Sequence, residues 1–203
     1  MSIGRCSTLA VLALLPFLSD CGPPLGVYRI DRVDIVAASR LLDIDPRWDL
    51  ESPSPLLRIV FTSDQDVETA SGGTGSGLYL WGDFCPFGDG SRLRVAGPYY
   101  GDRSIFPPAT TKRLPRGVHE VSSAPNRHPP RDPRTGRFIY TGYLFLRGAA
   151  YDLTRDHRDI CLGLSHPGYY LTRSRSDVFT LPAASVAAAI ARGVVTPPPL
   201  GAR

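Results

Sequence analysis

RFIYTGYLFLR, residues 137–147, is the stretch that decides the fold. It is rich in aromatic and β-branched side chains, which pack well on the half-buried, pleated surface of a sheet, and it therefore predicts a strand. Similar short apolar runs recur along the chain, with alternation at a period of two and with Gly, Pro and Asp between the runs. This pattern predicts that strands rather than helices build the protein.

Six further segments carry the strand pattern: 27–36, 55–62, 78–85, 91–96, 159–164 and 176–181. In the second of these, Leu57, Ile59 and Phe61 fall on one face. Asp89-Gly90 predicts a hairpin turn between 78–85 and 91–96, because glycine accepts a positive φ. Six to seven short strands with few helix formers predict an all-β fold, an antiparallel sandwich or barrel, and of the two we favour the β-sandwich.

One helix is expected, near the C-terminus of the sandwich domain predicted for 27–193. Pro182 suits a first helical turn, AASVAAAIAR (183–192) follows, and Gly193 stands where a C-cap belongs. The apolar face of this helix is mostly alanine, so we expect it to lie closely on the sheet. Residues 194–203 are expected to form a flexible tail.

Composition argues against a nucleic-acid partner. The chain has 203 residues, enough for one domain, and 42% of them are hydrophobic, enough for a packed core. The formal net charge of +4 comes from 23 basic and 19 acidic residues. Because both signs are interleaved along the chain, we expect a mixed surface rather than the basic stripe that binds nucleic acid.

The N-terminus has the features of an export signal. Arg5 supplies a positive charge, and CSTLAVLALLPFL (6–18) is an apolar run of 13 residues. Because a membrane-spanning helix needs about 20 residues, this run is too short to span and fits a signal peptide, which we assign to 1–20.

Leu18-Ser19-Asp20-Cys21 resembles the lipobox of bacterial lipoproteins, although Asp20 stands where Gly, Ala or Ser is normal. The resemblance covers about a tenth of the chain. It implies that Cys21 is acylated and becomes the first residue of the mature protein, held in membrane lipid, with 21–26 as a short tether. Gly22, in place of the Asp that signals inner-membrane retention, implies the periplasmic face of the outer membrane.

Cys85 and Cys161 are the two cysteines that lie outside the N-terminal segment. In a chain that enters an oxidising compartment, two remaining cysteines predict one disulfide, with free buried thiols as the alternative. Neither cysteine has a C-x-x-C neighbour, so we expect neither zinc nor a redox role.

Two features are candidates for binding. Tyr79 and Trp81 share one face of a predicted strand and could stack on a sugar ring, with core packing as the alternative. The Pro-rich loop 107–136 is basic, with six Lys/Arg against two acidic residues between 112 and 134. Such a loop could contact an anionic polymer, headgroup or protein face, or could be a solvated insertion. Its basic residues are Lys112, Arg113, Arg116, Arg127, Arg131 and Arg134.

Catalytic motifs are incomplete. GGTGSG (72–77) lacks the Lys-Ser/Thr that completes a phosphate-binding loop, and His157-Arg158-Asp159 lacks the other parts of a kinase site. We therefore predict an envelope lipoprotein with a structural or protein-interaction role, without catalysis, cofactor or metal. The alternatives are a small-molecule or glycan-binding module and a hydrolase whose site is assembled from distant residues.

Overall fold

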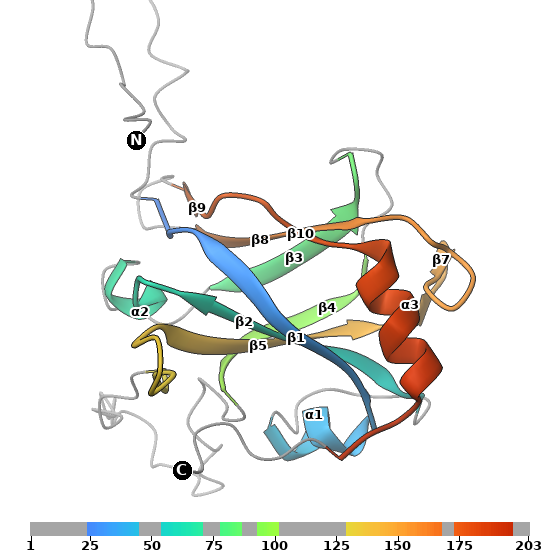
Figure 1. Ribbon diagram of the computed structural model, residues 1–203. Coiled ribbons are helices and arrows are strands. Elements are labelled where there is room, and N and C mark those ends of the chain that lie inside the picture. Colours follow the sequence, from blue (N-terminus) through green and yellow to red (C-terminus); the bar gives the residue numbers. More distant parts are fainter. Residues whose placement is uncertain are drawn as a thin grey trace, which may run out of the picture.

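The computed structural model describes residues 24–44, 54–70, 78–86, 93–101, 129–167 and 173–196. Two antiparallel sheets pack together as a sandwich (Figure 1), which confirms the predicted all-β class. Sheet A has the order β1 (Tyr28–Val36), β2 (Leu56–Ser63), β5 (Phe138–Phe145), β4 (Val95–Tyr100). Sheet B has the order β10 (Phe179–Leu181), β8 (Ile160–Pro167), β3 (Tyr79–Phe84), and β9 (Arg173–Arg175) also pairs with β8.

Shorter elements connect these strands. Helix α1 (Ser39–Ile44) follows β1, and helix α2 (Val67–Ala70) follows β2. Strands β6 (Arg147–Gly148) and β7 (Tyr151–Asp152) form a small hairpin between β5 and β8, and helix α3 (Ala183–Arg192) follows β10.

The main core lies between the two sheets. Alternation along each strand sends Leu57, Ile59 and Phe61 of β2 into this core, as the sequence predicts. Aromatic rings fill its centre: Phe61 stacks on Tyr140 with ring centroids 5.7 Å apart, and Phe179 lies 5.3 Å from Phe61. Burial of these large side chains is the main term that holds the sheets together.

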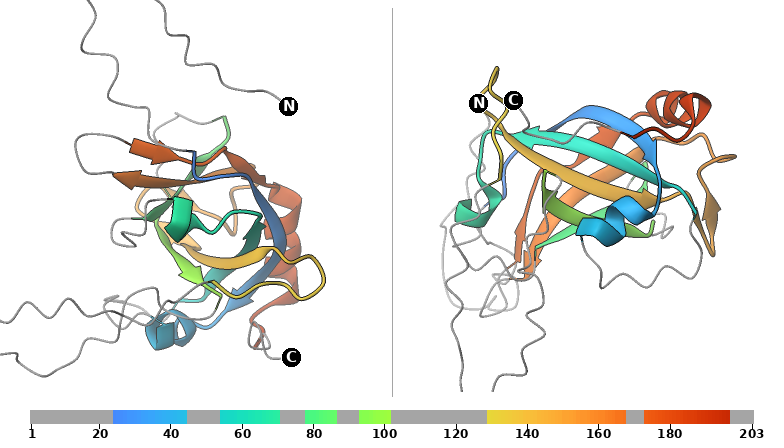
Figure 2. Two further views of the ribbon diagram at one scale, coloured as in Figure 1. Left: turned by 90° about the vertical axis from the view of Figure 1, so that its left-hand side faces the viewer. Right: turned by 90° about the horizontal axis from the view of Figure 1, so that it is seen from below.

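On both sides of the sandwich, an edge of sheet A approaches an edge of sheet B. At one side, Leu25 N–H donates to the Arg175 carbonyl at 3.0 Å, and Asp177 N–H donates to the Gly26 carbonyl at 3.3 Å. At the other side, Leu93 N–H donates to the Gly82 carbonyl at 3.0 Å. These bonds satisfy backbone groups that open sheet edges would leave unpaired, so the sandwich is close to a closed barrel. Figure 2 shows the curvature of the two layers.

The segments 78–85 and 91–96, expected to form a hairpin, lie side by side at Leu93 and Gly82 but do not pair as a continuous ladder. Strand β3 pairs with β8 in sheet B, whereas β4 pairs with β5 in sheet A. Asp89-Gly90 lies outside the described residues. A turn dipeptide reports only on local backbone geometry, and the pairing partners of these strands come from far along the chain.

The Cys85–Cys161 disulfide is present, with its Cα atoms 5.3 Å apart. Cys85 follows β3 directly and Cys161 lies on β8, so the bridge joins neighbouring strands of sheet B. It indicates an oxidising compartment outside the cytoplasm. Among the described residues, no helix combines the length and apolarity that crossing a membrane requires.

Helix α3 follows the prediction in position and caps. The Asp159 carboxylate accepts the N–H of Ala183 at 2.8 Å, and Gly193 ends the helix with a φ of 73°. Val186 and Ala189 face the core, and the helix packs against β1. Beyond it, Val195 N–H donates to the Ile35 carbonyl at 2.8 Å. Residues 197–203 of the expected tail lie outside the described residues.

Candidate functional site

The outer face of sheet B carries an aromatic pair. Tyr79 and Trp81 alternate with Leu80 on β3, and because Leu80 points into the core, both aromatic side chains point outward. Tyr79 is 57% exposed, and Trp81 is partly buried. Neither residue belongs to the core, so the core-packing alternative does not describe this pair.

The Trp81 indole lies close against the backbone of the next strand. Its register partner on β8 is Gly163, and a β-carbon built on Gly163 would fall 2.6 Å from the indole Cε2. A side chain at position 163 would therefore lift the ring away from the sheet. The missing side chain at Gly163 leaves the space that the indole occupies.

Polar residues border the aromatic pair. Ser165 of β8 is the register partner of both Tyr79 and Arg175, so these three residues form one row across the outer face of the sheet. We call Tyr79, Trp81, Gly163, Ser165 and Arg175 the aromatic shelf. Ring faces beside a hydroxyl and a guanidinium favour ligands that are partly apolar and partly hydrogen-bonding, such as sugars and lipid headgroups.

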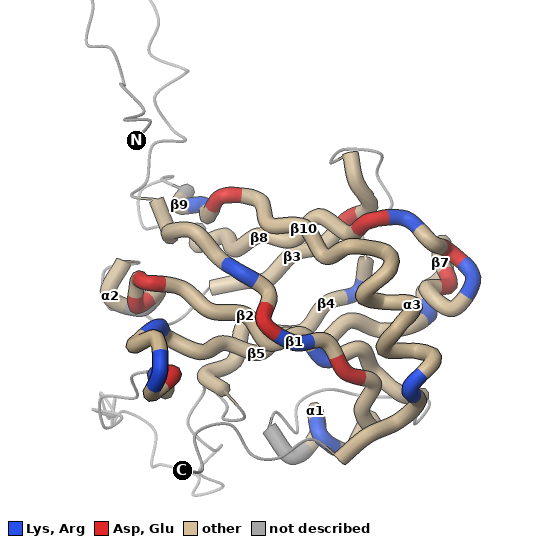
Figure 3. Tube along the Cα trace, in the orientation of Figure 1, with Lys and Arg blue, Asp and Glu red and all other residues tan. Residues whose placement is uncertain are grey.

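The predicted basic loop is described only in part. Lys112, Arg113, Arg116 and Arg127 lie outside the described residues, as does Cys21. Arg131 and Arg134 lie in the turn before β5, on the left in Figure 3. The Arg131 guanidinium lies 4.0 Å from the Phe138 ring centroid and donates to the Gly136 carbonyl at 3.2 Å. Arg134 is 88% exposed and lies 3.9 Å from Asp132.

A second polar cluster lies on the outer face of sheet A. Asp34 on β1 is the register partner of Arg58 on β2, and its carboxylate lies 3.7 Å from the Arg58 guanidinium. Arg32 Nε approaches the same carboxylate oxygen at 2.9 Å but is not aligned for a hydrogen bond. Arg58 is fully buried, so this pairing holds a cation inside the fold. We assign it a structural role.

Two buried tyrosines tie loops to the core. The Tyr28 hydroxyl donates to the Leu25 carbonyl at 2.7 Å, and Tyr140 binds the turn after β2. Burial raises the pKa of both phenols well above the ordinary value of 10. Both hydroxyls face interior backbone, so these groups serve stability rather than chemistry.

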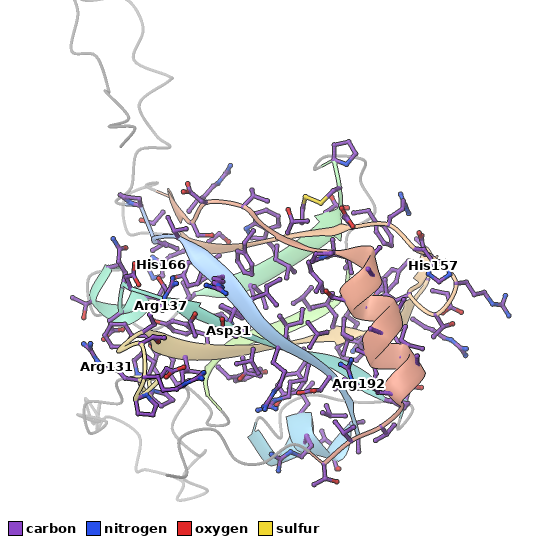
Figure 4. The ribbon with its side chains drawn as sticks, viewed as in Figure 1. Asp31, Arg131, Arg137, His157, His166 and Arg192 are labelled. Carbon is purple, nitrogen blue, oxygen red and sulfur yellow. A yellow bond between two sulfur atoms is a disulfide. The ribbon has the colours of Figure 1, made fainter. Side chains whose placement is uncertain are left out.

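The two histidines in the described part of the chain lie far apart. Figure 4 shows His157 and His166 at opposite ends of the sandwich. Among the described residues, no three His, Cys, Asp or Glu side chains gather in a way that could hold a metal ion.

Comparison of the chain with protein-family models, with curated proteins and with solved structures finds no match. The aromatic shelf is therefore identified as a candidate site by its geometry alone. Sequence reasoning found Tyr79 and Trp81 but missed Ser165 and Arg175, because strand register decides which distant residues lie beside them. The sequence does carry a signal for Gly163, since alternation in 159–164 puts it on the same face as Cys161, opposite Ile160, Leu162 and Leu164.

Proposed function

We propose that this chain is a bacterial envelope lipoprotein, acylated at Cys21, whose sandwich domain binds a partner at the membrane surface without catalysis. The observation that carries the proposal is the Cys85–Cys161 disulfide, because it indicates the oxidising compartment that the N-terminal signal also predicts. The proposed location is the periplasmic face of the outer membrane.

Tether length supports a role at the membrane surface. Leu25 is fully buried and hydrogen-bonded to Arg175, so the folded domain begins four residues after Cys21. An extended chain covers about 3.5 Å per residue, so Leu25 would lie at most about 14 Å from the acylated cysteine. Two or three acyl chains hold a protein firmly in a bilayer, whereas one does so only reversibly.

The test is the mass and location of the full-length protein expressed in a Gram-negative host. We expect it in the outer-membrane fraction, with an N-terminal diacylglyceryl peptide beginning at Cys21. Cys21→Ser is the matched variant, and it should lose both the adduct and the membrane association. A soluble protein with its leader intact would refute the proposal.

A glycan-binding module is the second candidate, and the exposure of Tyr79 beside the flat Trp81 ring favours it. Aromatic faces stack on the apolar side of pyranose rings, while Ser165 and Arg175 could bind sugar hydroxyls. Binding to a glycan array should be lost in Tyr79→Ala and Trp81→Ala and kept in Val194→Ala. Val194 is the control because it is also exposed and lies far from the shelf, beside Ile35.

A further inference from the structure

Two rows of register partners place the aromatic shelf, and the turn before β5 that carries Arg131 and Arg134, at the same end of the sandwich as Leu25. In sheet B, Tyr79 pairs with Ser165 and Ser165 with Arg175, whose carbonyl accepts the Leu25 N–H. In sheet A, the row from Tyr28 passes through Ser63 and Phe138 to Arg131. Strand β9 and the beginnings of β1 and β5 lie on the left in Figure 1. We call this the Leu25 end.

Exposed apolar side chains gather at the Leu25 end. Val27 is 62% exposed, Tyr79 is 57% exposed, and Val178 is 51% exposed. Val27 and Val178 follow Gly26 and Asp177, which are joined by a backbone hydrogen bond. Strands lie about 4.8 Å apart, so the shelf and these valines fall within about 15 Å of Leu25.

From this arrangement we propose that the Leu25 end seats on the phospholipid bilayer, with Tyr79 and the exposed valines in the interfacial zone. The inference rests on the proposed acylation of Cys21. Because Leu25 is only four positions after Cys21, it stays within about 14 Å of the lipid anchor, so the end that carries Leu25 faces the bilayer. Tyr and Trp are the side chains that membrane interfaces favour, because one part of each ring system is apolar and the other polar.

Among the residues that the structure describes, the charges at the Leu25 end balance. Four arginines, Arg131, Arg134, Arg137 and Arg175, share the Leu25 end with four aspartates, Asp64, Asp66, Asp132 and Asp177, and two close pairs form among them. Because opposite charges balance here, zwitterionic lipid should suffice and added salt should change little. A protein partner is less well supported, because the exposed large apolar side chains described at this end are only Val27, Tyr79 and Val178, too few for a stable protein–protein interface.

The experiment compares two tryptophan reporters at opposite ends of the sandwich. Both are made in the full chain with Trp48→Phe and Trp81→Phe. Tyr79→Trp reports from the Leu25 end, and Leu42→Trp, at a position 36% exposed on α1, is the matched control. Each protein is placed in phosphatidylcholine vesicles whose acyl chains are brominated near the headgroup. We expect Tyr79→Trp to lose roughly half of its fluorescence and Leu42→Trp to lose none, because quenching needs contact with the interfacial zone.

Equal quenching of both reporters, quenching of neither, or quenching of Leu42→Trp alone would overturn the proposed orientation. To separate this outcome from a failure of acylation, the same reporters are also attached chemically. In a Cys6→Ser background, Cys21 is coupled to a maleimide phospholipid, which supplies the same short tether whether or not a cell acylates it. If the Tyr79→Trp reporter is not quenched in that preparation, the shelf faces solvent and the proposed orientation is wrong. A solvent-facing shelf is the arrangement that the glycan-binding candidate requires.

Discussion

Tyr140 holds the turn around Val67 through both sides of its hydroxyl group. The hydroxyl accepts the Val67 N–H at 3.0 Å and donates to the Gln65 carbonyl at 3.1 Å. Val67 and Tyr140 are both fully buried, and they lie 73 residues apart in sequence. The contact fixes the connection between β2 and α2 from inside the core.

Replacing this hydroxyl should cost stability without disturbing the core. In Tyr140→Phe, the ring remains but the buried Val67 N–H loses its acceptor, which costs about 1–3 kcal/mol of the free energy of unfolding. Urea denaturation measures the change. Tyr79→Phe is the control, because its exposed hydroxyl should leave the stability unchanged. Equal stability of Tyr140→Phe and wild type would contradict the role given to the hydroxyl.

Stability should fall at high pH. The pKa values of Tyr28 and Tyr140 are raised in the folded state, so below pH 10 both phenols are neutral in the folded and the unfolded chain. Above pH 10 only the unfolded chain loses these protons, and the free energy of unfolding drops by about 1.4 kcal/mol per pH unit for each phenol. Denaturation curves from pH 9 to 12 test this. The double variant Tyr28→Phe/Tyr140→Phe should show a shallower decline, and an unchanged slope would count against it.

Opening the disulfide should destabilise the sandwich. The bridge spans 76 residues of sequence, and constraint of the unfolded chain over such a loop stabilises a protein by about 2–5 kcal/mol. The double variant Cys85→Ser/Cys161→Ser should unfold at a lower urea concentration than the wild type. Reductant should lower the urea midpoint of the wild type by the same amount. If reductant leaves the wild-type midpoint in place, the bridge does not stabilise the fold.

Substitution of Gly142 should destabilise the fold. It faces the core from β5, and a β-carbon there would overlap Leu80 Cδ2 of the opposite sheet. Gly142→Ala should lower the free energy of unfolding by about 1–3 kcal/mol through overpacking. Leu80→Ala alone should also destabilise, but in the double variant the two losses should partly cancel. Strict additivity would show that these positions do not compete for space.

Strand positions could be predicted because their signal is local. In β2, alternation correctly placed Leu57, Ile59 and Phe61 in the core. Alternation puts Arg58 and Thr62 on the opposite face of this strand, yet both are buried. Burial of a second face depends on what the rest of the chain lays over the sheet, as Leu41 of α1 does beside Leu56, and no local pattern carries that information.

The remaining elements were missed for similar reasons. Helices α1 and α2 span six and four residues, too few for a periodic apolar pattern to appear. Within the shelf, alternation identified Tyr79 and Trp81, but Arg175 reaches the same row only through the pairing of β9 with β8. Register between distant strands is a tertiary property, so the border of the site was not predictable.

The most direct test of the central claim is the intact mass of the protein extracted from membranes of an expressing Gram-negative host. We predict a chain that begins at Cys21, carries a diacylglyceryl group, and is two daltons lighter than its fully reduced form because of the Cys85–Cys161 bridge. A chain that begins at Met1 with no lipid and with all four thiols free would contradict the account.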